Sequence, residues 1–212
     1  MPQYSLINDK MLTVQLANEE VFAKKGSMIA YKGNVTFAPS TLGSEGMGGA
    51  AMRGVTGEGL QLMSVRGSGE VLYARHGMHI TLIQLQGEMF FVESGNVLAF
   101  DGRLRTGTMF LGNQGVQGFV RGAMSGQGLF TTTLEGYGEF AMLSDGNAIG
   151  LDVTPNRPIC VDPQAYIGHR GQLNSQVVTD VSWKTFVGQG SGESFQLKFT
   201  GQGTVYIQAS ER

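Results

Sequence analysis

The sequence predicts an all-β fold in which three tandem β-repeats of about 65–69 residues form one compact body. Three observations predict it: an excess of glycine, motifs that recur at a fixed spacing, and apolar residues that alternate with polar ones. Glycine makes up 33 of the 212 residues, about twice its average share. Since each glycine in a helix interior costs about 1 kcal/mol relative to alanine, this excess argues against a mainly helical protein.

Two glycine motifs recur along the chain. The first runs aliphatic, small, aromatic, charged and glycine, and its glycines lie 69 residues apart, at Gly33, Gly102 and Gly171. The second has two glycines separated by one residue and begins at Gly67, Gly136 and Gly201. We expect these six glycines to form structural turns or bulges, which often need the positive φ that glycine adopts most easily.

The spacing places copies of the repeat at about 10–77, 79–146 and 148–210. No linker composition separates the copies, so a single domain over residues 1–212 is predicted. Within the copies the hydrophobic period is two: residues 195–199 alternate strictly between apolar and polar, as a half-buried strand does. No stretch combines a helix cap with a 3.6-residue period, so no helix is expected.

The charge and the cysteine count narrow the function classes. Fifteen basic and 17 acidic residues give a net charge of −2, and the lack of a basic stripe argues against DNA binding. The single cysteine, Cys160, excludes an intrachain disulfide and fits a reducing compartment. We find neither a signal peptide nor an apolar run of about 20 residues. A cytoplasmic protein without a transmembrane segment is therefore predicted, while a peripheral membrane contact stays open.

Patterns that could carry chemistry are weak. The glycine-rich stretch 43–59 contains no Gly-Lys-Ser or Gly-Lys-Thr, so it is not a phosphate-binding loop of the Walker type. His76 and His79 could supply two metal ligands, but a third is missing nearby. Glu70 and Glu139 occupy equivalent positions and could be paired carboxylates, yet threonine takes that place in the third copy. We therefore predict no metal and no cofactor.

Two further residues are interpreted as structural. His169 lies at the repeat position of Tyr31 and Phe100, so a packing role is expected. Cys160 has no cysteine at the equivalent positions, and a buried, inert thiol is the default interpretation. Since no nucleophile motif is present either, we predict no catalytic residue and no enzymatic activity.

The loop at residues 42–54 is the candidate contact site. It contains Met47, Met52 and Arg53 among glycine, alanine and serine. Methionine suits adaptable binding surfaces because its side chain is flexible and polarisable. One interpretation is that the methionines fill gaps in the core or lie in a mobile loop. The other is that Met47, Met52 and Arg53 contact a ligand or a neighbouring subunit.

Several of the glycine motifs resemble a known family. They are Gly26-x-x-x-Ala30-x-x-Gly33-x-Val35, Gly57-Glu58-Gly59-Leu60, Gly67-x-Gly69 and Phe199-x-Gly201-x-Gly203-x-Val205-x-Ile207-Gln208. Together they resemble bacterial-type members of the altered-inheritance-of-mitochondria family, which is similar to TRAP, the trp RNA-binding attenuation protein. The resemblance covers nearly the whole chain. It implies that each copy is a short double-stranded β-helix unit. TRAP-like units form rings of about nine to eleven, and a homotrimer of this chain would supply nine.

Three functions remain open from the sequence. The first is a non-enzymatic, oligomeric β-repeat scaffold or interaction protein. The second is a binding protein for a small apolar or lipid-like ligand. The third is RNA binding by TRAP-like analogy, which the net charge and the absence of a recurring basic position argue against.

Overall fold

The structure is a computed structural model that describes residues 1–40, 60–110, 130–179 and 195–209. The predicted all-β class is confirmed: these residues form one compact antiparallel sheet of twelve strands, with a single 3₁₀ turn at Ser94–Asn96. The first six strands are β1 (Gln3–Asn8), β2 (Met11–Lys24), β3 (Met28–Pro39), β4 (Leu62–Tyr73), β5 (His79–Glu93) and β6 (Val97–Asp101). The others are β7 (Arg105–Phe110), β8 (Phe130–Ser144), β9 (Ile149–Val153), β10 (Ile159–Val161), β11 (Tyr166–Thr179) and β12 (Phe195–Ile207).

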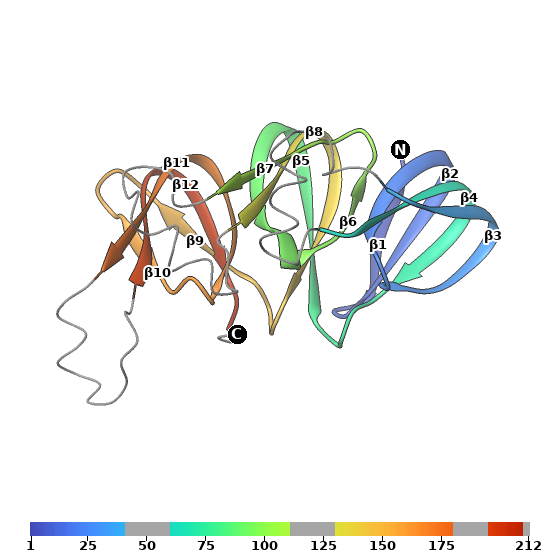
Figure 1. Ribbon diagram of the computed structural model, residues 1–212, viewed down its shortest axis with the longest axis horizontal. Coiled ribbons are helices and arrows are strands. Elements are labelled where there is room, and N and C mark those ends of the chain that lie inside the picture. Colours follow the sequence, from blue (N-terminus) through green and yellow to red (C-terminus); the bar gives the residue numbers. More distant parts are fainter. Residues whose placement is uncertain (41–59, 111–129, 180–194, 210–212) are drawn as a thin grey trace.

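The strands follow one another in a row along the longest axis of the molecule (Figure 1). Their order is β10-β12-β11-β5-β8-β6-β2-β4-β3, with β1 on β2, β7 on β8 and β9 on β12. The longest ladders are the antiparallel pairs β2 with β4, β5 with β8, and β11 with β12. The order therefore begins at β10 and ends at β3, at opposite ends of the row.

The core divides into three apolar clusters along this row. The first cluster is built mainly from β2 and β4, the second from β5 and β8, and the third from β11 and β12. Leu98 and Ala141 join the first cluster, and Ile167 joins the second. Because these side chains come from the neighbouring group of strands, the hydrophobic core is continuous along the row.

Two short ladders join the three groups of strands. The ladder between β2 and β6 has three rungs: Val21–Asp101, Phe22–Phe100 and Ala23–Ala99. The ladder between β5 and β11 also has three: Phe90–Arg170, Phe91–His169 and Val92–Gly168. Each residue of the second ladder lies 69 positions after its counterpart in the first. We call these two ladders the internal joints.

The middle rung of each internal joint is a contact between rings. The Phe22 and Phe100 ring centroids are 5.5 Å apart, and those of Phe91 and His169 are 4.4 Å apart with nearly parallel planes. Offset or tilted ring pairs at such distances add about 0.5–1.5 kcal/mol beyond the area that they bury. The rings therefore stabilise both joints.

A β-bulge interrupts each second strand just before the position of the joint. The register shifts between Met28 and Ala30 in β3, between Val97 and Ala99 in β6, and between Tyr166 and Gly168 in β11. The skipped residues are Ile29, Leu98 and Ile167. A bulge bends its strand and increases the local twist, so the three strands bend at matching places.

The six motif glycines occupy two kinds of position. Five lie inside strands and have positive φ: Gly33, Gly67, Gly136, Gly171 and Gly201. Gly102 lies in the turn between β6 and β7 and is not among the described residues with positive φ. At Gly171, with φ of +100°, a Cβ atom would lie 2.6 Å from the Gln202 carbonyl oxygen. Two strands thus approach too closely there for any side chain.

Candidate functional site

The predicted contact residues Met47, Met52 and Arg53 lie outside the described residues, as does the whole loop 42–54. Among the described residues, no helix has the length and hydropathy that a bilayer crossing requires. The remaining candidates are the titratable side chains, one surface hollow and the two end strands of the sheet.

The two histidines of the possible metal pair have different surroundings. His76 is exposed in the turn between β4 and β5, with φ of +48°. His79 begins β5, and its Nε2 atom lies 3.0 Å from the Oδ2 atom of Asp9. In the described part of the chain, no group of three or more histidine, cysteine, aspartate or glutamate side chains could hold a metal ion.

Glu70 and Glu139 have different partners. Hydrogen bonds from Lys32 and from the Thr13 hydroxyl lower the pKa of Glu70. Burial raises the pKa of Glu139, although the backbone N–H of Tyr4 donates to its carboxylate. Neither carboxylate lines the hollow described below. Each glutamate therefore serves as an acceptor within the sheet, and the geometry does not present the two to a common substrate.

His169 is part of the buried packing. It is 3% exposed, stacks on Phe91 and lies with its Nδ1 atom 2.7 Å from the Tyr166 hydroxyl. Burial lowers its pKa to about 4. The ring is therefore neutral at pH 7 and shielded from water, which fits the packing role that the repeat position predicts.

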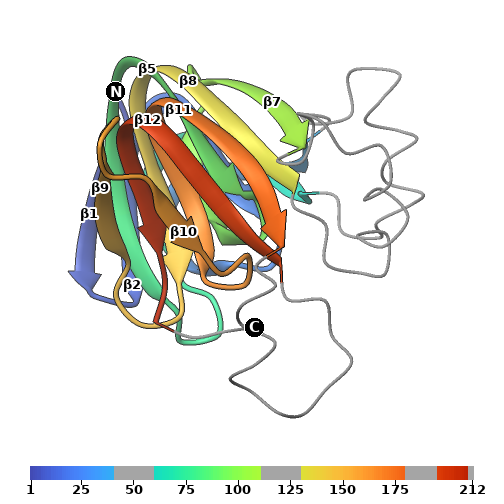
Figure 2. The ribbon, with the colours of Figure 1, turned by 90° about the vertical axis from the view of Figure 1, so that its left-hand side faces the viewer.

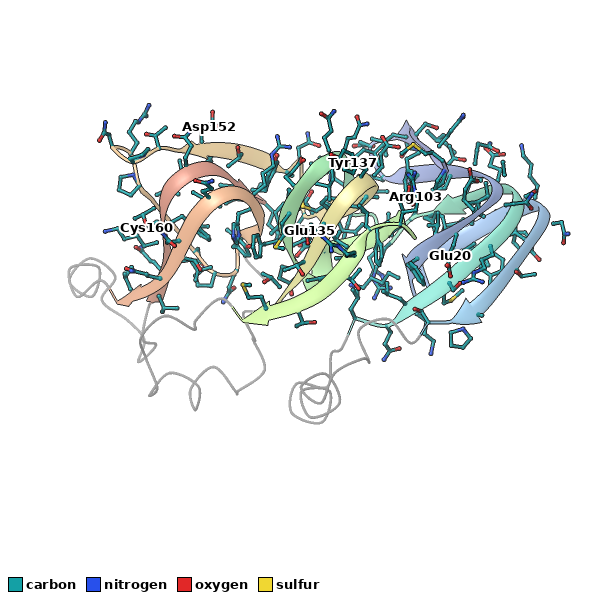
Figure 3. All side chains as sticks on the ribbon, turned by 90° about the horizontal axis from the view of Figure 1, so that it is seen from above. Glu20, Arg103, Glu135, Tyr137, Asp152 and Cys160 are labelled. Carbon is teal, nitrogen blue, oxygen red and sulfur yellow. The ribbon has the colours of Figure 1, made fainter. Side chains whose placement is uncertain are left out.

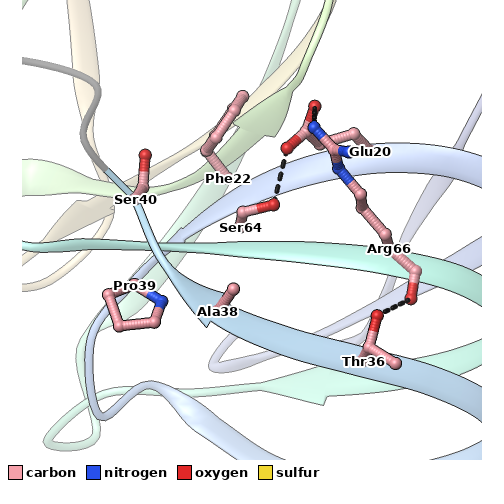
Figure 4. Close-up of a pocket in the computed structure, with 8 residues that line it drawn as sticks. All are labelled: Glu20, Phe22, Thr36, Ala38, Pro39, Ser40, Ser64 and Arg66. Atoms are coloured by element: carbon pink, nitrogen blue, oxygen red, sulfur yellow. Dashed lines mark hydrogen bonds and ion pairs between the residues drawn. The ribbon is translucent and has the colours of Figure 1, made fainter.

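A shallow hollow of about 360 Å³ opens beside the end of β3 (Figure 4). Glu20, Ser64 and Arg66 form its polar side, and Phe22 and Pro39 contribute apolar surface. The Ser64 hydroxyl donates to one oxygen of the Glu20 carboxylate at 2.5 Å, and Arg66 donates to the other at 2.8 Å.

The polar side of this hollow is internally paired. Partial burial favours the protonated form of Glu20, but the hydrogen bonds from Arg66 and Ser64 outweigh it and lower the pKa. Both carboxylate oxygens already accept a hydrogen bond, so Glu20 is a poor general base here. The hollow can make polar contacts, and the carboxylate beside its Ser64 hydroxyl is already paired with Arg66.

The edge of β3 is apolar and exposed. Its first residues include Met28, Ile29 and Tyr31, and Tyr31 is 50% exposed. Within the described residues this strand pairs only with β4. Edge strands usually carry charges or prolines that prevent further pairing; here the strand has one charged residue, Lys32, held by an ion pair with Glu70, and one proline, Pro39, at its far end.

The opposite end of the row is the short strand β10. It pairs with β12 through Ile159–Phe199, Cys160–Lys198 and Val161–Leu197, and its other edge is open in the described part of the structure. Figure 2 shows β10 at the front of this end, and Figure 3 places Cys160 at the end farthest from the first strands. Cys160 is exposed, so the interpretation as a buried thiol is wrong: the edge on which it lies has no neighbour among the described strands.

The sequence patterns do not single out these two edges directly. The available signal is the repeat position itself. Tyr31 occupies the place of Phe100 and His169, and Cys160 occupies the place of Phe22 and Phe91. In the middle copy both places lie inside joints, with Phe100 buried and Phe91 partly buried, whereas at the two ends of the row Tyr31 and Cys160 are exposed.

The comparisons with known proteins agree with this fold. No curated protein matches the chain. The X-ray crystal structure of protein SPYM3_0169 from Streptococcus pyogenes is similar, with a TM-score of 0.71 and 20% sequence identity over 100% of this chain and 94% of that one. The family model of mitochondrial biogenesis AIM24 matches residues 4–210. Since this match spans nearly the whole chain, the protein belongs to the AIM24 family.

Proposed function

We propose that the protein is a non-enzymatic scaffold or interaction protein, built from three β-units in a row, that associates with copies of itself. The observation that carries this proposal is the pair of internal joints. They use equivalent strands in the same register. The two open edges of the sheet belong to the same kinds of strand that pair in these joints. The same contact can therefore form between the open edges of two copies of the chain.

Each unit combines a first, a second and a third strand. The first strands are β2, β5 and the β9–β10 pair; the second are β3, the β6–β7 pair and β11; the third are β4, β8 and β12. In every unit the first and second strands both pair with the third. This common plan and the three matching bulges support the interpretation as three short double-stranded β-helix units.

The polar side chains support a non-catalytic role. Glu20, Glu70 and Asp101 each pair with a cation and accept hydrogen bonds inside the sheet. Enzymes instead gather unpaired acids, bases or nucleophiles around a cleft. We see no such group around the hollow beside β3.

Self-association would also protect the sheet. A row of β-units that ends in two open edges is prone to uncontrolled pairing, and a closed head-to-tail arrangement removes both edges. By resemblance to TRAP-like rings, we propose a homotrimer that supplies nine units.

The test is the mass of the purified full chain at micromolar concentration, measured by light scattering and by native mass spectrometry. We expect a single closed oligomer, a trimer in the nine-unit version. A monomer at these concentrations would overturn the self-associating scaffold. The same spectra test the alternative of an apolar or lipid-like ligand, because a retained molecule would add a constant mass to each chain.

A further inference from the structure

We propose that the open edge of β10 in one copy pairs antiparallel with the open edge of β3 in another copy, with Cys160 opposite Tyr31. The proposal rests on the self-association above and specifies its contact. It places Ile159 opposite Lys32 and Val161 opposite Ala30. We call this three-rung ladder the intermolecular seam.

The register follows from the internal joints. In each internal joint a first strand pairs with a second strand: Phe22 faces Phe100 in one, and Phe91 faces His169 in the other. Both residues of the second pair lie 69 positions after those of the first. Advancing the first strand by another 69 positions gives Cys160. The second-strand residue at the same repeat position in the first unit is Tyr31. Among the described strands, β10 pairs only with β12 and β3 pairs only with β4, so we assign the partners of their open edges to different copies.

The backbone of both edges is set up for this pairing. The Gly102 N–H donates to the Glu20 carbonyl oxygen at 2.9 Å beside the first joint. Since backbone groups in a strand alternate in direction, Phe22 and Phe100 also direct their N–H and C=O groups at each other. We assign the outward direction to the N–H and C=O groups of Cys160 and Tyr31 as well, because these residues occupy the repeat positions of Phe22 and Phe100. Pairing satisfies these groups, which otherwise depend on water.

The side chains fit the seam as well. The middle rung joins two rings in each internal joint, and in the seam it joins the Tyr31 ring to the Cys160 sulfur, a contact that favours aromatic edges. The third rung contains a small residue on the second strand in every case: Ala99, Gly168 and here Ala30. At Gly168 a Cβ atom would lie 2.7 Å from the Phe90 ring, so little room exists at that place.

Exposure separates the edges from the joints. Phe100 is fully buried and His169 is 3% exposed, whereas Tyr31 at the same position is 50% exposed. Lys32 does not oppose the seam, because its ammonium group is exposed and paired with Glu70 of its own chain. The seam therefore buries apolar surface without burying an unpaired charge.

The test uses the native cysteine as a cross-linking partner. Directly opposite, hydrogen-bonded residues of an antiparallel pair have Cα atoms about 5.5 Å apart, within the range of disulfides. We introduce Tyr31→Cys in the full chain and oxidise it mildly with diamide. We expect a covalent ladder of oligomers on a non-reducing gel that ends at the size found by light scattering.

Two matched variants control the experiment. In Lys32→Cys the new thiol lies one residue along β3 and faces the opposite side of the sheet, so we expect at least tenfold less cross-linking. In Tyr31→Cys/Cys160→Ser the native partner is removed, and we expect none of the ladder. Equal cross-linking of the Tyr31→Cys and Lys32→Cys variants would overturn the register.

The outcomes distinguish the seam from the scaffold function. An oligomer by light scattering that does not cross-link through positions 31 and 160 overturns the seam and leaves the self-associating scaffold in place. A monomeric protein overturns both. Cross-linking of the Tyr31→Cys variant alone, in an oligomer of the same mass as the native protein, supports both.

Discussion

At Gly171 the backbones of β11 and β12 approach each other closely. We expect Gly171→Ala to lower the free energy of unfolding by roughly 3 kcal/mol, because alanine would need both a strained φ and space that the Gln202 carbonyl oxygen occupies. Urea denaturation followed by circular dichroism measures the loss. Gly77→Ala is the matched control, since Gly77 also has positive φ but has no atom within 4 Å of a built Cβ. We expect that control to lose only about 1 kcal/mol; equal losses would contradict the close approach at Gly171.

His169 couples folding to pH. Its pKa is lowered by burial to about 4 in the folded chain and is about 6.5 in an unfolded one. The unfolded state therefore takes up the proton first, and stability that is present above pH 6.5 is lost as the pH falls toward 4. By linkage, the free energy of unfolding should drop by about 2 kcal/mol between pH 7.5 and pH 5 on account of this group.

The double variant His169→Phe/Tyr166→Phe isolates that contribution. It removes both members of the buried hydrogen bond and keeps the ring contact that Phe100 makes at the equivalent position. We expect urea midpoints measured at pH 7.5 and pH 5 to differ less in the variant than in the native chain. An unchanged pH dependence would show that another group causes it.

The repeat position is informative for single residues, but residue type alone does not predict burial. The alignment of His169 with Tyr31 and Phe100 predicts packing, and His169 is buried among rings. The usual burial of cysteine predicts a buried Cys160, and this residue is exposed. The difference is physical: residue type describes a preference for burial, while the position of β10 at the end of the row decides whether a neighbour exists.

The internal joints are the elements that connect the core. We expect Phe100→Ala to lower the free energy of unfolding by about 3–5 kcal/mol, because it removes a fully buried ring that contacts Phe22 across a joint. Denaturation at low protein concentration measures this. Tyr31→Ala, at the equivalent open position, should cost the dissociated chain less than about 1 kcal/mol and should instead weaken association by light scattering. The reverse pattern would contradict the joint–edge distinction.

At the level of strands, the alternating pattern is a good guide. It predicts a strand at residues 195–199, and these residues begin β12. It predicts neither the break between β6 and β7 nor the ladder of β6 on β2. Periodicity reports which face of a strand is buried, but it does not report which strand lies beside it, and the partners Phe22 and Phe100 are far apart in sequence.

For the whole molecule, the single cysteine of the sequence reports on assembly. If β10 lies against β3 of another copy, the Cys160 thiol is covered in the assembled protein. It should then react with N-ethylmaleimide several-fold more slowly than in protein diluted below the dissociation constant of the oligomer. Intact-mass spectrometry of timed samples measures the rate. A denatured sample sets the maximum rate, and equal rates at both dilutions in a protein that does dissociate would contradict burial of the thiol.

The two internal joints are made by one covalent chain, whereas the proposed seam joins two chains. For every three contacts in a closed assembly, two form at the high effective concentration of neighbouring segments, and only the third depends on how much protein the cell contains. Because the three units lie in one chain, the residues at the three contacts can differ. One contact uses two phenylalanines, one a phenylalanine and a histidine, and the proposed seam a cysteine and a tyrosine. The single contact that must form between molecules can thus change its strength by mutation at positions 31 and 160 while the two inside the chain keep theirs.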